Sequence, residues 1–210
     1  MTAEGRTGTG WFEPLYAGAR RDAAAVPWAR LAPDPQLLAW LDQPDLDVDG
    51  SDALVVGCGL GDDAAELARR GCRVTAIDLS QSAVDWATER HAAAGIEFRC
   101  ADLLDLPQDL VAAAGLVVEI RTVQSLNEPL RADAMRAIAS TVAPGGVLLH
   151  VGLVATSPRA AKTSQGPPWA ISPDELAVYE QAGLERMDLA HPAGVDGESM
   201  EVVLTMMRPA

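Results

Sequence analysis

The sequence has few aromatic residues, almost no lysine and a shortage of positive charge, and these shortages exclude whole classes of partner. Aromatic residues make up 4% of the chain, and Lys162 is its single lysine. The 30 acidic residues outnumber the 16 basic residues, which leaves a net charge of −14. Such a chain has no basic surface that could neutralise the phosphates of a nucleic acid or an anionic membrane, so we expect neither partner.

The chain is also poor in cysteine. Cys58, Cys72 and Cys100 are odd in number, and they have neither a C-x-x-C spacing nor a cluster of histidines nearby. This pattern argues against a disulfide framework and against a zinc site, so we predict no bound metal. We expect the three side chains to be small, buried, apolar fillers.

Long hydrophobic runs are lacking as well. The longest strongly apolar stretch, residues 147–155, contains His150 and is too short to cross a bilayer. The first ten residues include Glu4 and Arg6 and lack the apolar core of a signal peptide. We therefore predict a cytoplasmic protein without a membrane segment, and we expect His150 to be a hydrogen-bonded core histidine.

A regular alternation of elements begins at residue 51. Short runs of β-branched residues there alternate with amphipathic stretches of helical length. This alternation predicts an α/β fold in which helices join parallel strands. We expect strands at residues 53–56, 73–77, 96–99, 116–122 and 146–155, and helices at 62–70, 80–91 and 130–142.

The last third of the chain changes character. Residues 156–171 are rich in proline, serine and glycine, which predicts a long exposed loop. The sequence SPDE at 172–175 is a capping box with proline at the first helical position, and it predicts a helix that ends near Gly183. The runs 184–189 and 200–206 then predict an antiparallel hairpin.

A glycine-rich turn, residues 57–61, follows the first predicted strand. Glycines at such a position let the backbone approach a ligand closely. Asp78 lies nineteen residues after Gly59, at the end of the second strand, where a carboxylate can accept hydrogen bonds from both hydroxyls of a ribose. Together these features predict a nucleoside-binding site.

The spacing of the glycines argues against a dinucleotide. A dinucleotide turn has the pattern G-x-G-x-x-G, whereas here the third glycine comes one residue early. Asp62 and Asp63 stand at the start of the next helix, where they would repel a pyrophosphate or simply support the helix end. A nucleoside with a positive sulfonium and an amino group fits this setting better.

Three segments carry a family resemblance. The sequences GCGLGDDAAELARRG, VTAIDLSQSAVDWA and FRCADLLDLP resemble, in this order, motifs I, II and III of class I S-adenosylmethionine-dependent methyltransferases. The segment VPWARLAPDPQLLAWL is similar to the N-terminal segment of the thiopurine-methyltransferase-like small-molecule group. The resemblance implies a Rossmann-like three-layer αβα sandwich, with a seven-stranded, mostly parallel sheet ending in the hairpin. It also implies one domain, 1–210, with an N-terminal cover (1–50), a cofactor-binding core (51–155) and a substrate loop, helix and hairpin (156–210).

The resemblance assigns the cofactor S-adenosyl-L-methionine and the residues that hold it. The glycines would lie against its methionine and ribose, and Asp78 would bind the ribose hydroxyls. Asp102 would accept a hydrogen bond from the adenine amino group, and Leu79 and Leu103 would pack on the adenine ring. Val55 stands where the family often has an acid, so the methionine amino group needs another acceptor, such as Glu119 or a carbonyl. The implied cofactor-binding residues are Gly57, Cys58, Gly59, Gly61, Asp78, Leu79, Asp102, Leu103 and Glu119.

The acceptor side of the site is predicted from the fourth strand and from the aromatic residues. Glu119 and Arg121 end that strand and are our catalytic candidates, although a local ion pair between them is an equal alternative. Aromatic residues outside the strands suit the walls of an apolar pocket, and equally a packed cover. The substrate-binding candidates are Trp11, Tyr16, Trp28, Arg121 and Trp169.

These residues predict methyl transfer to an oxygen, a sulfur or a similar nucleophile of a small molecule, by a monomer or homodimer. The chemistry is an in-line displacement, for which alignment of the reactants can suffice. The fourth strand is followed by no DPPY or NPPY run, which argues against methylation of nucleobase or glutamine amino groups. The alternatives are an NAD(P)-dependent oxidoreductase, which the glycine spacing and the lack of a Tyr-x-x-x-Lys pattern disfavour, and a non-catalytic nucleoside-binding module.

Overall fold

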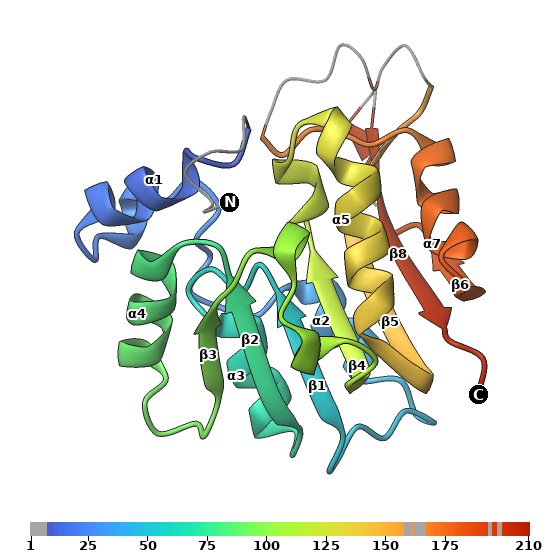
Figure 1. Cartoon of the computed structure of the whole chain (residues 1–210), viewed down its shortest axis with the longest axis horizontal. Coiled ribbons are helices and arrows are strands. Elements are labelled where there is room, and N and C mark those ends of the chain that lie inside the picture. The colour runs from blue at the N-terminus through green and yellow to red at the C-terminus, as the bar shows by residue number, and fades with distance from the viewer. Residues whose placement is uncertain (1–7, 158–160, 162–166, 193–194, 197–198) are drawn as a thin grey trace. The chain divides into compact units, whose positions relative to one another are not determined.

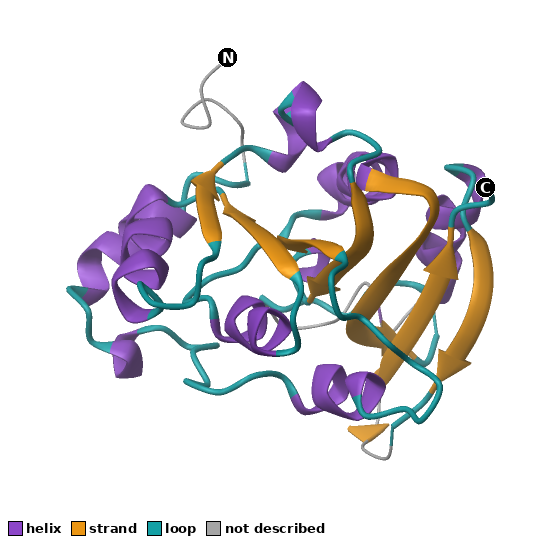
Figure 2. Cartoon of the chain, turned by 90° about the horizontal axis from the view of Figure 1, so that it is seen from below, coloured by secondary structure: helices purple, strands orange, loops and turns teal. Residues whose placement is uncertain are grey.

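The computed structural model describes residues 8–157, 161, 167–192, 195–196 and 199–210 (Figure 1). The chain divides into two compact units, Met1–Pro107 and Gln108–Ala210, which we call the first and the second unit. Strands and helices alternate along the chain as far as β6 (Glu185–Ala190), and Figure 2 colours the strands orange and the helices purple. Within the described part of the chain, no helix has the length and apolar character needed to cross a membrane.

The first unit contains a parallel ladder of three strands in the order β3-β2-β1. Parallel neighbours need crossover connections, and two helices supply them. Four of the five residues of the first strand are buried, as in strands that are covered on both faces. The elements are β1 (Asp52–Val56), α3 (Asp62–Arg69), β2 (Arg73–Asp78), α4 (Gln81–Arg90), β3 (Glu97–Cys100) and the 3-10 turn η3 (Leu103–Asp105).

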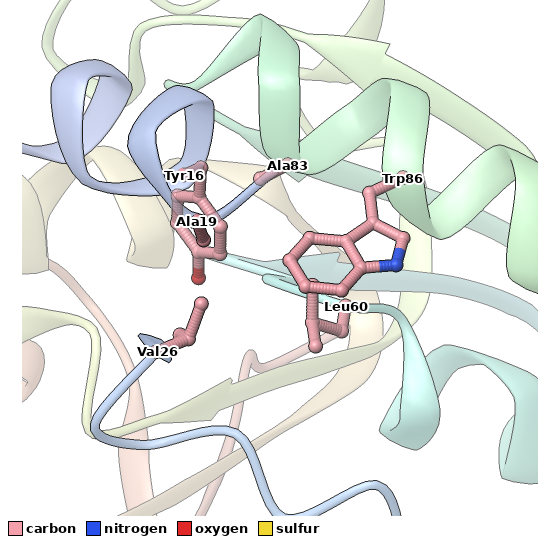
Figure 3. Close-up of a cluster of buried hydrophobic side chains, with 6 residues drawn as sticks. All are labelled: Tyr16, Ala19, Val26, Leu60, Ala83 and Trp86. Carbon is pink, nitrogen blue, oxygen red and sulfur yellow. The ribbon is translucent and has the colours of Figure 1, made fainter. Parts of the chain in front are cut away.

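The N-terminal segment is part of the core of the first unit. It forms α1 (Phe12–Ala19), the 3-10 turn η2 (Ala23–Ala25) and α2 (Pro35–Leu41). Its buried side chains pack with the glycine turn and with α4 in one cluster (Figure 3), made of Tyr16, Ala19, Val26, Leu60, Ala83 and Trp86.

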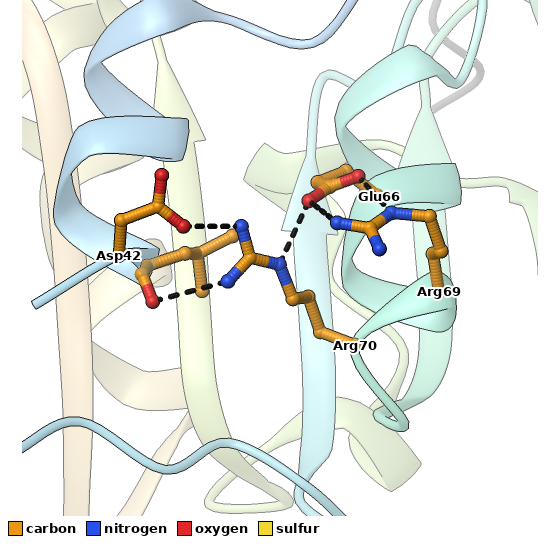
Figure 4. A network of polar contacts seen from close by, with 5 residues as sticks. Asp42, Glu66, Arg69 and Arg70 are labelled. Carbon is orange, nitrogen blue, oxygen red and sulfur yellow. Dashed lines mark hydrogen bonds and ion pairs between the residues drawn. The ribbon is translucent and has the colours of Figure 1, made fainter. Parts of the chain in front are cut away.

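An ionic network attaches α2 to α3 (Figure 4). The buried carboxylate of Glu66 accepts hydrogen bonds from Arg69 and from Arg70, and Arg70 also binds Asp42 after α2 at 2.6 Å. The hydrogen bonds from Arg69 hold the pKa of Glu66 below its usual value although burial raises it. The C-terminal end of α3 is thereby tied to the N-terminal segment.

The second unit contains four strands in the order β4-β5-β8-β6, with the short β7 paired to β8. β4 and β5 are parallel, and β8 runs antiparallel to both β5 and β6, which confirms the predicted hairpin. The strands are β4 (Ala114–Ile120), β5 (Val142–Ala155), β6 (Glu185–Ala190), β7 (Val195–Asp196) and β8 (Ser199–Met207). The helices are η4 (Gln108–Leu110), η5 (Val123–Ser125), α5 (Glu128–Thr141), η6 (Pro173–Leu176) and α7 (Ala177–Gln181).

The structure corrects several predicted boundaries. β4 ends at Ile120 rather than at 122, because Arg121 turns into the left-handed region with φ 57°. The capping box at Ser172 is confirmed, but a 3-10 turn precedes the α-helix. The predicted exposed loop is wrong at its end, since Ala170 and Ile171 are buried and Ile171 bridges to Val154. Residues 158–160 and 162–166 of that loop lie outside the described residues.

The prediction for the cysteines is correct in part. Cys72 is buried and Cys58 is half-buried, but Cys100 is exposed. Cys100 ends β3, an edge strand whose side chains are partly open to solvent. A pattern of cysteine spacing contains no information about such an edge.

Candidate functional site

The glycine turn connects β1 to α3 and takes backbone conformations that favour glycine. Gly57, Gly59 and Gly61 have φ values of 67°, 52° and 82°. A Cβ on Gly61 would lie 2.8 Å from the ring of Phe98, and a Cβ on Gly59 would lie 3.0 Å from the hydroxyl of Tyr16. The turn is therefore packed closely on both sides.

Asp78 lies beside this turn at the end of β2. Its Oδ2 accepts a hydrogen bond from the N–H of Gly59, and its Oδ1 accepts one from the N–H of Ser80, both at 2.9 Å. Burial raises the pKa of Asp78, although the N–H groups of Ser80, Gly59 and Leu79 counteract this, and the negative charge of Glu13 raises it further. Asp78 thus holds the turn in place with acceptor capacity left for a ligand.

The segment after β3 reaches the same edge of the first unit. The N–H of Ala101 donates to the carbonyl of Asp78 at 2.9 Å, and the N–H of Cys58 donates to the carbonyl of Ile77 at 2.9 Å. These bonds bring together the loops that follow β1, β2 and β3. Asp102, whose Oδ1 accepts the N–H of Leu104, is half-buried there, as are Cys58, Leu79 and Leu103.

The acids at the start of α3 are occupied by other elements. Asp62 forms two hydrogen bonds with Arg90, at 2.9 and 2.7 Å, and Asp63 accepts the N–H of Asp34 at 2.7 Å. Neither side chain caps α3, and Arg90 weakens the repulsion of a pyrophosphate that we expected of Asp62. His91 is half-buried beside Leu60, and burial lowers its pKa.

Three of the four aromatic candidates for the acceptor pocket gather in the first unit. The indole N–H of Trp28 donates to the hydroxyl of Tyr16 at 2.8 Å, and Trp11 meets the edge of Trp28 at a centroid distance of 5.6 Å. Tyr16 is buried, whereas Trp28 is 37% exposed. The sequence contained no sign that Tyr16 would reach the glycine turn.

Glu119 is completely buried in the second unit. Its Oε1 accepts the N–H groups of Thr122 and Val123 at 2.6 and 3.0 Å, and its Oε2 forms an ion pair with Nδ1 of His150. The hydroxyl of Tyr179 lies 3.3 Å from the same nitrogen, and burial, together with the charge of Glu119, raises the pKa of Tyr179.

The local ion pair between Glu119 and Arg121, the equal alternative to a catalytic role, is therefore not formed. Arg121 pairs with Glu201 of β8 instead, because its left-handed backbone turns it away from the line of β4. His150 lies in the core as expected, but in the described part of the chain its Nε2 has no hydrogen-bond partner. The expectation of a fully hydrogen-bonded histidine is thus corrected.

Gln124 is a buried residue that sequence reasoning missed. Its side chain accepts the N–H of Leu153 and donates to the carbonyls of Leu153 and Trp169, at 2.7, 2.7 and 3.0 Å. The N–H of Trp169 also donates to the carbonyl of Gln124 at 2.8 Å. A single glutamine after a strand carries no sequence signal that would have identified this role.

The fold belongs to a known class. The chain resembles the [4+2]-cyclase SpnF with a TM-score of 0.69 and 19% identity, over 83% of this chain and 80% of that one, which shows the Rossmann-like α/β fold. Seven strands, three in the first unit and four in the second, form its mostly parallel sheet with antiparallel strands at the C-terminus, and β7 is additional.

Residues 53–146 match the family described as "Methyltransferase domain". This segment is therefore similar to a methyltransferase domain, and it covers less than half of the chain. Ubiquinone biosynthesis O-methyltransferase of Acinetobacter baylyi is 30% identical over 116 residues, which are 54% of this chain and 48% of that protein. Fatty-acid O-methyltransferase of Mycolicibacterium smegmatis is 43% identical over 63 residues, 29% of this chain and 23% of that one. The chain spans about half the length, or less, of these curated relatives.

Proposed function

We propose that this protein transfers a methyl group from S-adenosylmethionine to an oxygen atom of a small molecule. The observation that carries the proposal is the joint position of Asp78 and the glycine turn, which hydrogen-bond to each other through Gly59. The choice of oxygen as the acceptor atom is supported by the similarity to two proteins that are named O-methyltransferases. The thiopurine-methyltransferase-like grouping and a monomeric or homodimeric state remain part of this proposal.

The residues of the first unit fit this cofactor. Asp78 accepts the ribose hydroxyls, Asp102 accepts the adenine amino group, and Leu79 and Leu103 pack on the ring. The charges near the turn are negative: Glu13 and Asp78 raise the pKa values of neighbouring groups, and a cationic ligand relieves this repulsion. When bound, the cofactor supplies an electrophilic methyl group and a sulfonium leaving group, so no nucleophile on the protein is required.

The residues of the second unit are proposed to serve the acceptor. Both carboxylate oxygens of Glu119 contact groups of the second unit. We therefore assign Glu119 to positioning the turn at residues 121–125 and not to contact with the reacting atoms. Arg121 and Trp169 remain candidates for binding the acceptor. Trp11 and Trp28 of the first unit are separate candidates for that role.

Calorimetric titration with S-adenosylhomocysteine tests the cofactor assignment. We expect the wild-type protein to bind it and Asp78→Ala to bind it with about 30-fold lower affinity, because the ribose hydroxyls lose a charged acceptor worth about 2 kcal/mol. Asp52→Ala is the matched control, since Asp52 starts β1 and pairs with Arg73 on the surface. Binding of NAD(H) without binding of S-adenosylhomocysteine would support an oxidoreductase and refute the proposal.

Turnover is tested with radiolabelled S-adenosylmethionine and two acceptors, a medium-chain fatty acid and a simple phenol. We expect labelled product that is extracted as an ester or an ether. Cofactor binding without transfer to either acceptor, or to a thiol offered in parallel, would instead indicate a non-catalytic nucleoside-binding module.

A further inference from the structure

The hydroxyl of Tyr16 lies against the glycine turn. α1 carries this side chain into the core of the first unit, where it is 3% exposed. Its Oη is 3.0 Å from the position that a Cβ on Gly59 would occupy. The same glycine donates its N–H to Asp78, so the phenol reaches the part of the turn that faces the proposed nucleoside.

The hydrogen bonding of this hydroxyl leaves its proton available. Trp28 donates its indole N–H to Oη at 2.8 Å, which occupies the acceptor side of the phenol. Trp28 is the one hydrogen-bond partner of Tyr16 among the residues that the structure describes. Burial and the nearby charge of Asp78 raise the pKa of Tyr16, so the phenol stays protonated and acts as a donor.

The position of Tyr16 is preorganised. Glu13 of α1 accepts hydrogen bonds from Ser80 and Ser82 at the start of α4, at distances between 2.5 and 3.0 Å. Arg21, just after α1, forms two hydrogen bonds with Glu89 of α4. A donor that is held in this way loses little further freedom when a ligand binds.

We propose that Tyr16 binds the cofactor by donating a hydrogen bond to the carboxylate of its methionine moiety, with Trp28 as the positioning residue. This inference rests on the proposed function, and it moves Tyr16 from the acceptor pocket to the cofactor site. The carboxylate is the one anionic group of the cofactor, and it must lie near a turn whose neighbours Asp78 and Glu13 are themselves acidic. Arg90, a cation beside the turn, is already held by Asp62 and by the carbonyl of Leu60. A neutral donor such as the phenol is therefore the group suited to hold that carboxylate.

Two ligands separate this contact from others in the site. S-adenosylhomocysteine contains the methionine-derived carboxylate, whereas 5′-methylthioadenosine has the same nucleoside and a thioether but no amino-acid group. For Tyr16→Phe, we expect the affinity for S-adenosylhomocysteine to fall about tenfold and the affinity for methylthioadenosine to change less than about twofold, because a hydrogen bond to a charged group is lost only in the first case. Calorimetry measures both.

Two further variants complete the experiment. Trp28→Phe keeps the phenol but removes its positioning bond, and we expect a smaller loss, about threefold, again for S-adenosylhomocysteine alone. Tyr179→Phe removes a buried hydroxyl in the second unit and serves as the matched control, with both affinities unchanged. Thermal unfolding without ligand shows that each variant is folded. If Tyr16→Phe does not fold, the affinities of Trp28→Phe for the two ligands are compared with those of the wild type instead.

The possible outcomes are distinct. If Tyr16→Phe lost equal affinity for both ligands, the phenol would contact the nucleoside that they share, and the proposed contact with the carboxylate would be overturned. If Tyr16→Phe kept its affinity for both ligands, Tyr16 would not bind the cofactor. Failure of the wild-type protein to bind either ligand would refute the proposed function itself, before any variant is compared.

Discussion

The two units differ in how their buried polar side chains are satisfied. In the first unit, Asp78 is bound by neutral backbone N–H groups, and within the described residues no cation pairs with it. Among the described residues, Tyr16 has a partner for its oxygen but none for its proton. In the second unit, Oε1 of Glu119 accepts two backbone N–H groups, its Oε2 lies against Nδ1 of His150, and Gln124 makes three side-chain hydrogen bonds, while Nε2 of His150 has no hydrogen-bond partner among the described residues.

This difference distinguishes a ligand site from a scaffold. Burying a polar group costs free energy unless its hydrogen bonds are made, so internal partners indicate that a group supports the fold. A buried acid with a raised pKa and spare acceptor capacity at the end of a strand is instead poised for a partner that the protein does not supply. Asp78 and Glu119 both lie near the carboxyl ends of parallel strands, and their different surroundings support the opposite roles that we propose for them.

The largest expected effect concerns the scaffold. Glu119→Ala leaves His150 and the N–H groups of Thr122 and Val123 without their acceptor, and we expect the free energy of unfolding to fall by about 3 to 5 kcal/mol. Urea denaturation measures this, with the exposed Glu97→Ala as a control that changes stability by less than about 0.5 kcal/mol. Undiminished stability with loss of S-adenosylhomocysteine binding would instead make Glu119 a ligand contact.

An intermediate effect is expected from pH at Asp78. Ribose hydroxyls donate to the ionised carboxylate, so affinity for S-adenosylhomocysteine should decrease as the pH falls through the raised pKa, above the usual aspartate value of about 4. Asp78→Asn should bind more weakly and without this pH dependence. Calorimetry between about pH 4.5 and 8 tests this, and a flat wild-type profile would contradict it.

The same raised pKa has a consequence for the stability of the ligand-free protein. A folded state that binds a proton more tightly than the unfolded chain loses that advantage as the pH rises from the unfolded pKa to the folded one. At pH values above the folded-state pKa, the buried charged carboxylate of Asp78 should therefore reduce the free energy of unfolding. Comparing the pH dependence of urea unfolding in the wild type and in Asp78→Asn isolates this contribution.

The smallest effect is expected at Arg121. Its ion pair with Glu201 is partly exposed, so Arg121→Met should change the free energy of unfolding by less than about 1 kcal/mol. With a fatty acid as acceptor, KM should rise while the affinity for S-adenosylhomocysteine stays nearly unchanged. Equal weakening of acceptor and cofactor would identify Arg121 as a structural residue alone.

The sequence by itself determined the elements and predicted the cofactor side of the proposed site. β-branched runs and amphipathic stretches predicted most strands and helices to within a few residues, and SPDE predicted the capping box at Ser172. Gly59 and Asp78 could be paired in advance, because the ends of adjacent parallel strands meet at one edge. Each of these inferences depends on local pattern or on a regular topology.

The tertiary structure alone decided the partners of the polar side chains. Arg121 pairs with Glu201, 80 residues away, and not with Glu119, because the left-handed turn after β4 redirects it. Glu119 meets His150 because the register of β4 on β5 places them side by side. Tyr16 reaches Gly59 because α1 packs on α4. Such contacts depend on how distant segments pack, and short-range periodicity contains no record of that packing.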